Sequence, residues 1–348
     1  MPSKPIFGFY SSWATYRSGK GQCSVENIDP NLCTHLLYAF ALLDSNGSIV
    51  LKDHGDRDAM RRFNALRDTR NPRLRTLVSI GGARDCAPAF QCVAASSHLR
   101  AAFARNVRKF CTTNGFNGVD IDWEFPESST DRNNFVHLLA ALSAQLKGNG
   151  LLLTTSVGVN REYDWTGVAK YVDYILLMSY DYIGSWDPYT GHNAPLFSGR
   201  VETDYQKENL NVKASVGNWI RGGAPWTKLI VGLAAYGRTF TLRDTGNHDV
   251  RAGASGAGRA GPYTKENGTL AYYEIKEAFG QRYWDVDQHV PYAVNGDQWV
   301  SYDDPESIRK KCYYINTEGL GGAMIWSIDM DEFQDGKFTL LRTVVQHF

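Results

Sequence analysis

The segment Gly118-Val119-Asp120-Ile121-Asp122-Trp123-Glu124-Phe125-Pro126 alternates acidic with apolar side chains. This period of two is typical of an extended strand, in which successive side chains point to opposite faces. We therefore expect Asp120, Asp122 and Glu124 to share one face of a strand. Three carboxyl groups at that spacing would repel one another if all were ionised. At least one is expected to hold a proton near neutral pH.

Apolar runs rich in β-branched residues recur along the chain, and helical patterns lie between them. Most runs are continuously hydrophobic, as expected for parallel strands buried on both faces. The expected strands are 6–10, 35–42, 75–80, 118–125, 151–157, 174–180, 229–236 and 322–328, and the expected helices are 57–67, 98–112, 131–147, 209–221 and 305–316. Eight such strands predict an α/β fold of the (β/α)8 TIM-barrel type. A doubly wound dinucleotide-binding sheet is disfavoured, because no Gly-x-Gly-x-x-Gly follows a strand.

One connection, 239–304, is too long for a loop inside a compact domain and should have structure of its own. It contains strand-like pieces at 270–273, 291–294 and 299–302. We expect a small inserted α+β subdomain here, between the seventh strand and the last helix, which forms one wall of a cleft. The barrel would then comprise residues 1–238 and 305–348.

The charge balance is even, with 37 Lys and Arg against 37 Asp and Glu, which argues against nucleic acid or an anionic membrane as the partner. No apolar run is long enough to span a bilayer. Two acceptor sequons, at Asn46 and Asn267, favour a secreted protein over a cytosolic one, with any signal peptide already removed. A monomer is expected.

The six cysteines show no zinc-like spacing, so no structural metal is expected. Cys86 and Cys92 flank a short stretch and could form a disulfide, and Cys23 and Cys33 are a second candidate pair. Free thiols are the alternative for each pair.

In a barrel of this type, the site lies at the carboxyl ends of the strands. Glu124 should lie at the top of its strand, with Asp122 one layer below and Asp120 deeper. The other strand ends supply Trp13, Phe40, Met178, Tyr180, Asp181, Tyr236, Arg238, Met324 and Trp326. Acids facing aromatic and thioether groups suit a neutral, ring-shaped, polyhydroxylated ligand with an apolar face.

Three interpretations of the acid series compete. A divalent cation site is disfavoured, because acids on one strand do not converge as ligands do and no His accompanies them. A purely structural role is disfavoured, because buried acids are costly to keep for packing alone. A proton relay remains, in which Asp120 and Asp122 tune Glu124 as a general acid, with no metal and no cofactor.

The segment 118–126 resembles the D-G-x-D-x-D-W-E signature of family 18 glycoside hydrolases, which include chitinases and chitinase-like lectins. The likeness continues in family order through 27–35, 79–82, 178–181, 184–186, 228–237 and 321–329. The stretches 255–258 and 271–273 resemble the inserted subdomain of animal chitinases.

The resemblance implies a chitinase that hydrolyses β-1,4-linked N-acetylglucosamine polymers or oligomers. Glu124 matches the proton donor, and Asp122 matches the acid that orients the substrate's own acetamido nucleophile after exchanging its hydrogen bond with Asp120. Tyr180 matches the residue that holds the acetamido oxygen. The residues matched to the substrate-binding cleft are Trp13, Phe40, Met178, Asp181, Tyr236, Arg238, Met324 and Trp326.

Several positions depart from the family pattern. Ala83 stands where a stacking Trp is usual, and Phe125 replaces a common Tyr. Gly8 stands where animal members have the Cys that pairs with the counterpart of Cys33, which leaves Cys23 as the alternative partner. A non-hydrolytic chitin-binding lectin is the main functional alternative, although such lectins typically lack the terminal Glu. A glycosidase that trims N-glycan cores is a weaker one.

Overall fold

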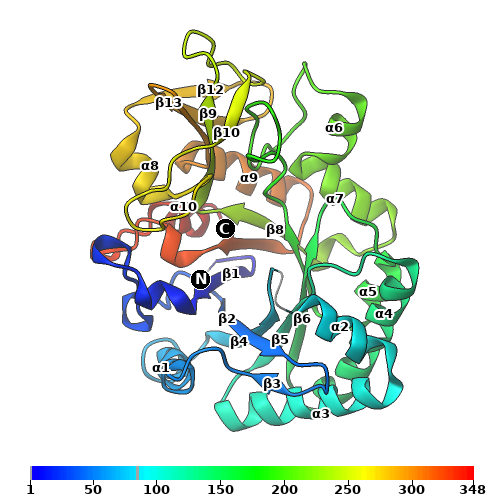
Figure 1. Cartoon of the computed structure of the whole chain (residues 1–348). Coiled ribbons are helices and arrows are strands. Elements are labelled where there is room, and N and C mark those ends of the chain that lie inside the picture. The colour runs from blue at the N-terminus through cyan, green and yellow to red at the C-terminus, as the bar shows by residue number, and fades with distance from the viewer. Residues whose placement is uncertain (1, 84–85) are drawn as a thin grey trace.

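The protein is a closed parallel barrel with a second sheet beside it, as Figure 1 shows for the computed structural model, which describes residues 2–83 and 86–348. The barrel strands follow the order β1-β15-β8-β7-β6-β5-β4-β2, and β1 pairs with β2 to close the ring. Their bounds are β1 Ile6–Ser11, β2 His35–Leu43, β4 Arg75–Gly81, β5 Gly118–Asp122, β6 Leu152–Gly158, β7 Tyr174–Met178, β8 Leu229–Ala234 and β15 Gly322–Trp326. The predicted (β/α)8 barrel is confirmed.

Helices surround the barrel: α1 Asp56–Thr69, α2 Ala87–Ala95, α3 Ser97–Asn114, α4 Ser129–Leu146, α5 Trp165–Tyr171, α6 Asp204–Asn209, α7 Val212–Arg221, α9 Pro305–Thr317 and α10 Thr339–His347. The predictions covered α1, α3, α4, α7 and α9 and missed the others. The missed helices have at most nine residues, too few turns to show a clear apolar period. No helix in the described part of the chain is long and apolar enough to cross a membrane.

The acidic strand β5 is shorter than predicted. It ends at Asp122, where it pairs with Gly81 of β4 and Ser156 of β6, so Glu124 lies beyond the strand end. Trp123 turns toward the helices and packs between Phe90 and Phe135, with ring centroids 5.6 Å from each. The alternation continues past the end of β5: the apolar side chains face the helices, and the acids face the barrel axis.

The inserted segment forms a separate antiparallel sheet of order β10-β9-β14-β13-β12, and β11 pairs with β9. Its elements are β9 Tyr236–Leu242, β10 Ala254–Ala257, β11 Thr269–Ala271, α8 Tyr272–Ala278, β12 Gln281–Asp285, β13 Val290–Asn295 and β14 Gln298–Ser301. The strand expected at 270–273 continues only to Ala271. There the Glu274 carboxylate accepts the Ala271 N–H (2.9 Å) and starts α8.

Neither predicted disulfide is present. Cys86 precedes α2, and Cys92 lies on the exposed face of this helix. Six residues of helix rise about 9 Å along the axis, which is too far for a disulfide between these two cysteines. Cys23 and Cys33 are separate buried thiols. The Cys33 sulfur lies against Gly8, 2.7 Å from where a β-carbon at that position would stand. The family resemblance implies a cysteine partner for Cys33 at position 8, and this chain has Gly8 there.

Gly81 is a point where the barrel tolerates no side chain. Its φ is +125°, and a β-carbon there would lie 1.9 Å from the backbone oxygen of Asp122. We predict that Gly81→Ala lowers the free energy of unfolding by at least about 3 kcal/mol, measured by urea denaturation. Gly148→Ala is the matched control, because nothing lies within 4 Å of that position. Equal urea midpoints for Gly81→Ala and the unchanged chain would refute this account of the β4–β5 contact.

Candidate active site at the carboxyl end of the barrel

Asp120 forms the base of the acid column and is fully buried. Its carboxylate accepts hydrogen bonds from three hydroxyls: Ser79 Oγ of β4 (2.8 Å), Thr154 Oγ1 of β6 (2.7 Å) and Ser156 Oγ of β6 (2.9 Å). Burial raises the pKa of Asp120, and the three hydrogen bonds oppose that rise. The neighbouring strands therefore compensate much of the cost of a carboxyl group in the barrel interior.

Asp122 lies one layer above and lines the cleft. Burial raises its pKa well above the usual range, and the charges of Glu124 and Asp120 add to the rise. Its Oδ1 atom is buried and has no hydrogen-bond partner within residues 2–83 and 86–348. A buried polar atom without a partner at a cavity wall marks a place for a polar ligand group.

Glu124 is the acid at the mouth of the column. Burial is the largest cause that raises its pKa to about 7, and the charge of Asp181 contributes. The hydrogen bond with Asp122 and the charge of Arg161 act in the opposite direction. Glu124 therefore keeps its proton below neutral pH, and a large share of the molecules still carry it at neutral pH, as a general acid requires. The sequence predicted a retained proton from like-charge repulsion, whereas burial is the larger cause here.

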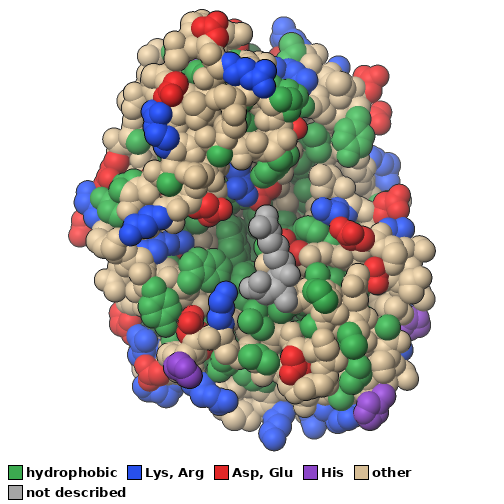
Figure 2. Space-filling view, in the orientation of Figure 1, with side chains coloured by type: hydrophobic (Ala, Val, Ile, Leu, Met, Phe, Trp, Pro, Cys, Tyr) green, Lys and Arg blue, Asp and Glu red, His purple; other side chains and the backbone are tan. Residues whose placement is uncertain are grey.

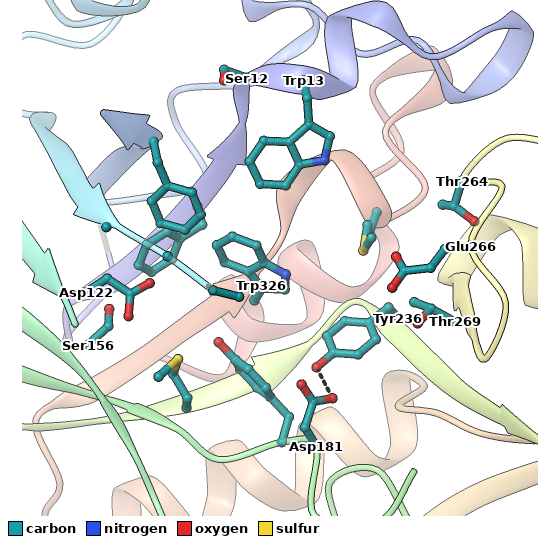
Figure 3. Close-up of a pocket in the computed structure, with 18 of the residues that line it drawn as sticks. Ser12, Trp13, Asp122, Ser156, Asp181, Tyr236, Thr264, Glu266, Thr269 and Trp326 are labelled. Atoms are coloured by element: carbon teal, nitrogen blue, oxygen red, sulfur yellow. Dashed lines mark hydrogen bonds between the residues drawn. The ribbon is translucent and has the colours of Figure 1, made fainter. Parts of the chain in front are cut away.

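Tyr180 and Asp181 follow β7 and face the acids across the cleft. Asp181 has a φ of +59°, and its Oδ1 accepts the Tyr236 hydroxyl (2.6 Å, Figure 3). The same oxygen accepts a hydrogen bond from Arg238 Nε (2.7 Å). Both partners belong to β9 of the inserted sheet. Burial raises the pKa of the Tyr180 hydroxyl well above its usual value, so it remains a hydrogen-bond donor across the ordinary pH range.

Asn193 holds this corner in place, and the sequence gave no indication of it. Its Oδ1 accepts the Asp181 backbone N–H (2.9 Å), and its Nδ2 donates to the Tyr236 carbonyl (3.3 Å). The Asn193 backbone N–H in turn donates to Ser301 Oγ of β14 (3.0 Å). Asn193 thus connects the end of β7 to two strands of the inserted sheet.

Aromatic rings form the wall beside the acids. Phe40 stacks on Trp326 with a centroid distance of 5.7 Å and on Trp13 at 6.0 Å. Trp13 is 41% exposed, and Figure 3 shows Trp326 at the centre of the pocket with Trp13 beyond it. Such ring faces provide flat apolar surfaces for the apolar face of a sugar.

Two adjoining cavities make up the cleft, which is hollowed between the barrel and the second sheet (Figure 2). The larger, of about 640 Å³, contains the aromatic wall and Asp122. The smaller, of about 570 Å³, contains Glu124 together with Phe125, Arg161 and Trp186. The residues that line both cavities are Ala83, Met178, Tyr180, Asp181 and Arg238.

The structure thus brings most of the predicted site residues to one cleft. Asp120 and Met324 lie beneath the surface, and neither lines either of these two cavities. Sequence reasoning missed Thr154 and Ser156, although their alternation along a strand adjacent to the acidic one was a usable signal. No group of three or more potential metal ligands is present among the residues that the structure describes.

The barrel, its acid column and its inserted sheet define a class of glycoside hydrolase. The sequence pattern described as "Glycosyl hydrolases family 18" matches residues 5–331, and the chain belongs to this family.

Related proteins match nearly the whole chain. Chitotriosidase-1 of Mus musculus is 38% identical over 97% of this chain and 76% of that protein. Chitinase-3-like protein 2 of Homo sapiens is 37% identical over 97% of this chain and 90% of that protein. The probable endochitinase of Caenorhabditis elegans is 37% identical over 94% of this chain, which spans only 56% of that protein.

Solved structures show the same fold. The Group IV chitinase of Ostrinia furnacalis superposes with a TM-score of 0.94 at 37% identity over 99% of both chains. Human YKL-39, described as a pseudo-chitinase with retained chitooligosaccharide binding, gives a TM-score of 0.94 at 35% identity over 99% of both chains. The relatives therefore include proteins described as chitinases and one described as a pseudo-chitinase.

The raised pKa of Glu124 has a consequence for stability. Its folded-state pKa of about 7 exceeds the usual value of 4.5, so the folded state binds this proton more tightly than the unfolded state. The resulting stabilisation is complete below about pH 4.5 and is lost as the pH rises through about 7. Glutamine cannot ionise, so Glu124→Gln does not lose this stabilisation at high pH. We predict that its free energy of unfolding exceeds that of the unchanged chain by about 1–3 kcal/mol at about pH 8, but by little at about pH 4. Urea denaturation at both pH values measures it, and an identical pH dependence in the two proteins would contradict it.

Proposed function

We propose that this protein is a chitinase, which hydrolyses β-1,4-linked N-acetylglucosamine polymers and oligomers with retention of configuration. The observation that carries the proposal is the arrangement of Glu124 and Asp122. A carboxyl group with a pKa of about 7 stands at the cleft beside a buried carboxyl oxygen that has no hydrogen-bond partner among the residues that the structure describes. The first suits a proton donor, and the second suits an acceptor for an amide N–H of the substrate.

The reaction would begin with transfer of the Glu124 proton to the glycosidic oxygen. The acetamido oxygen of the same sugar attacks the anomeric carbon as the glycosidic C–O bond breaks, which gives a cyclic oxazolinium ion and a free sugar alcohol. Asp122 would accept the acetamido N–H, and the Tyr180 hydroxyl would donate to the acetamido oxygen. Glu124, now ionised, then takes a proton from the water that opens the ring. Because the substrate provides the nucleophile, no second protein carboxylate is needed for attack.

The shape of the cleft supports a linear substrate. Exposed indole rings stand at both of its cavities, Trp13 in the larger and Trp186 in the smaller, and Trp186 is 60% exposed. Sugar rings on either side of the scissile bond would stack on these platforms. Ala83 leaves open the position where relatives of this type carry a further Trp, so contacts on the leaving-group side would depend more on Phe125 and Trp186.

A non-hydrolytic lectin is the second candidate, because YKL-39 is described as a pseudo-chitinase that binds chitooligosaccharides. The presence of Glu124 with its raised pKa favours hydrolysis over that alternative.

Replacement of the proton donor separates these candidates. We predict that Glu124→Gln lowers kcat on a chromogenic N-acetylglucosamine oligomer by about 10²–10⁴-fold, because leaving-group protonation is lost. Oligomer affinity, measured by calorimetry, should change by less than about tenfold, since the aromatic platforms are intact. The control is Glu162→Gln at an exposed glutamate that pairs with Arg132. An unchanged kcat in Glu124→Gln would identify another proton donor, and no turnover by the unaltered chain would favour the lectin.

The acetamido nucleophile can be tested on the substrate itself. We predict that an oligomer of β-1,4-linked glucosamine, which lacks the N-acetyl groups, is cleaved at least about 10³-fold more slowly than its acetylated counterpart. Product analysis by mass spectrometry on both oligomers measures this ratio. Comparable rates would exclude substrate-assisted catalysis even if Glu124 proves essential.

A further inference from the structure

The even charge balance of the whole chain conceals a strong separation of charge. Residues 48–115 contain 13 Lys and Arg against 5 Asp and Glu, a net charge of +8. The remaining 280 residues contain 24 Lys and Arg against 32 Asp and Glu, a net charge of −8. The cationic segment includes α1, α2 and α3, and α3 contains no acidic residue.

The fold gathers part of this charge into a groove. The short strand β3 (Ile49–Val50), the loop after it and the start of α1 lie against the second half of α3. Asn106 of α3 donates to the Gly47 carbonyl (2.8 Å), and Asn64 of α1 donates to the Asn114 carbonyl (2.7 Å), which fixes this juxtaposition. Figure 2 shows Lys and Arg side chains along the edge of the molecule where Figure 1 places α1 and α3.

We call this feature the basic groove. It encloses about 650 Å³. Its lining residues include the cationic Lys52, Arg57 and Lys109, together with His54, Asn106 and Phe110. Asp53 is its one acidic lining residue among those described.

The cations of residues 48–115 differ in whether they have an acidic partner. Arg61, Arg62 and Arg67 of α1 pair with nearby acids. By contrast, Arg57, Arg105, Arg108 and Lys109 make no ion pair with any residue in the ranges 2–83 and 86–348, and all four are exposed. Arg105 and Lys109 are one turn apart on the same face of α3.

Stabilisation of the α3 C-terminus explains only part of this pattern. Cations favour the last turn of a helix, which accounts for residues close to Asn114. Arg105 stands nine residues before that end, beyond the range of the effect, and Arg57 stands at the N-terminal end of α1, where a cation is unfavourable. Arg57 and Lys109 line the groove without an acidic partner among the described residues, and Arg105 stands one turn from Lys109. These like charges repel one another, and a bound polyanion would reduce that repulsion.

The groove joins the cleft described above, because Lys52 and Asp53 line both cavities. A polymer held in the groove would therefore lie beside the mouth of the site. We propose that the basic groove binds a linear anionic polysaccharide, one that carries sulfate or carboxylate groups, and that this binding is separate from hydrolysis.

The lining disfavours the other polyanions. Single-stranded nucleic acid is usually held by several stacking aromatic side chains, whereas Phe110, half-buried, is the only Phe, Tyr or Trp among the described residues of the groove. A membrane surface calls for exposed apolar anchors, and Val50, at 40% exposure, is the only large exposed hydrophobic residue that the structure describes between 48 and 115. Sulfate and carboxylate groups need only cations and polar donors along a track.

The experiment compares two triple variants of the whole chain, with a fluorescent heparin oligosaccharide as the probe. Arg105→Gln, Arg108→Gln and Lys109→Gln together make the groove variant, which removes three exposed cations of α3, one of them (Lys109) in the groove lining. Arg200→Gln, Arg221→Gln and Arg309→Gln together remove the same number of exposed cations elsewhere. Fluorescence anisotropy at about 50 mM and about 200 mM salt gives affinity and its salt dependence.

We expect the groove variant to lose about tenfold or more in heparin affinity at the lower salt and to show a shallower salt dependence, while the control variant changes little. The single change Arg57→Gln should weaken heparin binding in the same direction. Hydrolysis of short N-acetylglucosamine oligomers should be unchanged in all three, so the result does not depend on the proposed chitinase activity. Equal heparin affinity of the groove variant and the unaltered chain would overturn the proposal. So would equal losses in the two triple variants, or equally tight binding of single-stranded DNA or phosphatidylserine vesicles through the same residues.

Discussion

The burial of three carboxyl groups in one column of the barrel is the constraint on which the site depends. Carboxyl groups in such surroundings resist ionisation, and each must find partners or keep its proton. Asp120 finds partners, because the strands on either side present hydroxyls at its level. Asp122 and Glu124 have fewer, and their pKa values rise accordingly. The same burial that costs stability supplies an acid that is still protonated near neutral pH.

The second structural feature is the connection between the barrel and the inserted sheet. Asp181 belongs to the end of a barrel strand, yet the groups that hold its carboxylate, Tyr236 and Arg238, belong to β9. Asn193 and Ser301 extend this connection to β14. The inserted sheet therefore does more than form a wall: it orients a charged residue that itself raises the pKa of Glu124. A substitution in the inserted sheet that moves Asp181 would therefore also change the pKa of Glu124.

The fold was largely predictable wherever the pattern was long and repeated. The eight buried strands and the five long helices were visible, because burial on both faces or along one stripe imposes a regular period. The short helices α2, α5, α6 and α10 were not, since they have too few turns to show one. The end of β5 and the start of α8 were set by particular contacts, namely the limits of ladder pairing and the capping by Glu274. The predicted disulfides failed for a similar reason, because closeness along the chain does not fix the direction of a side chain.

By itself, the sequence determined that three acids point to the same side at the carboxyl end of one barrel strand, because that follows from the period of two and from the repeated strand–helix pattern. Only the tertiary structure decided how far the pKa of each acid is raised and why. Burial depends on what packs around a group, and the hydroxyls that satisfy Asp120 come from strands about 35 to 40 residues away in the chain. Asn193, Arg161 and the basic groove were likewise beyond the sequence, since each acts through neighbours that only folding brings together.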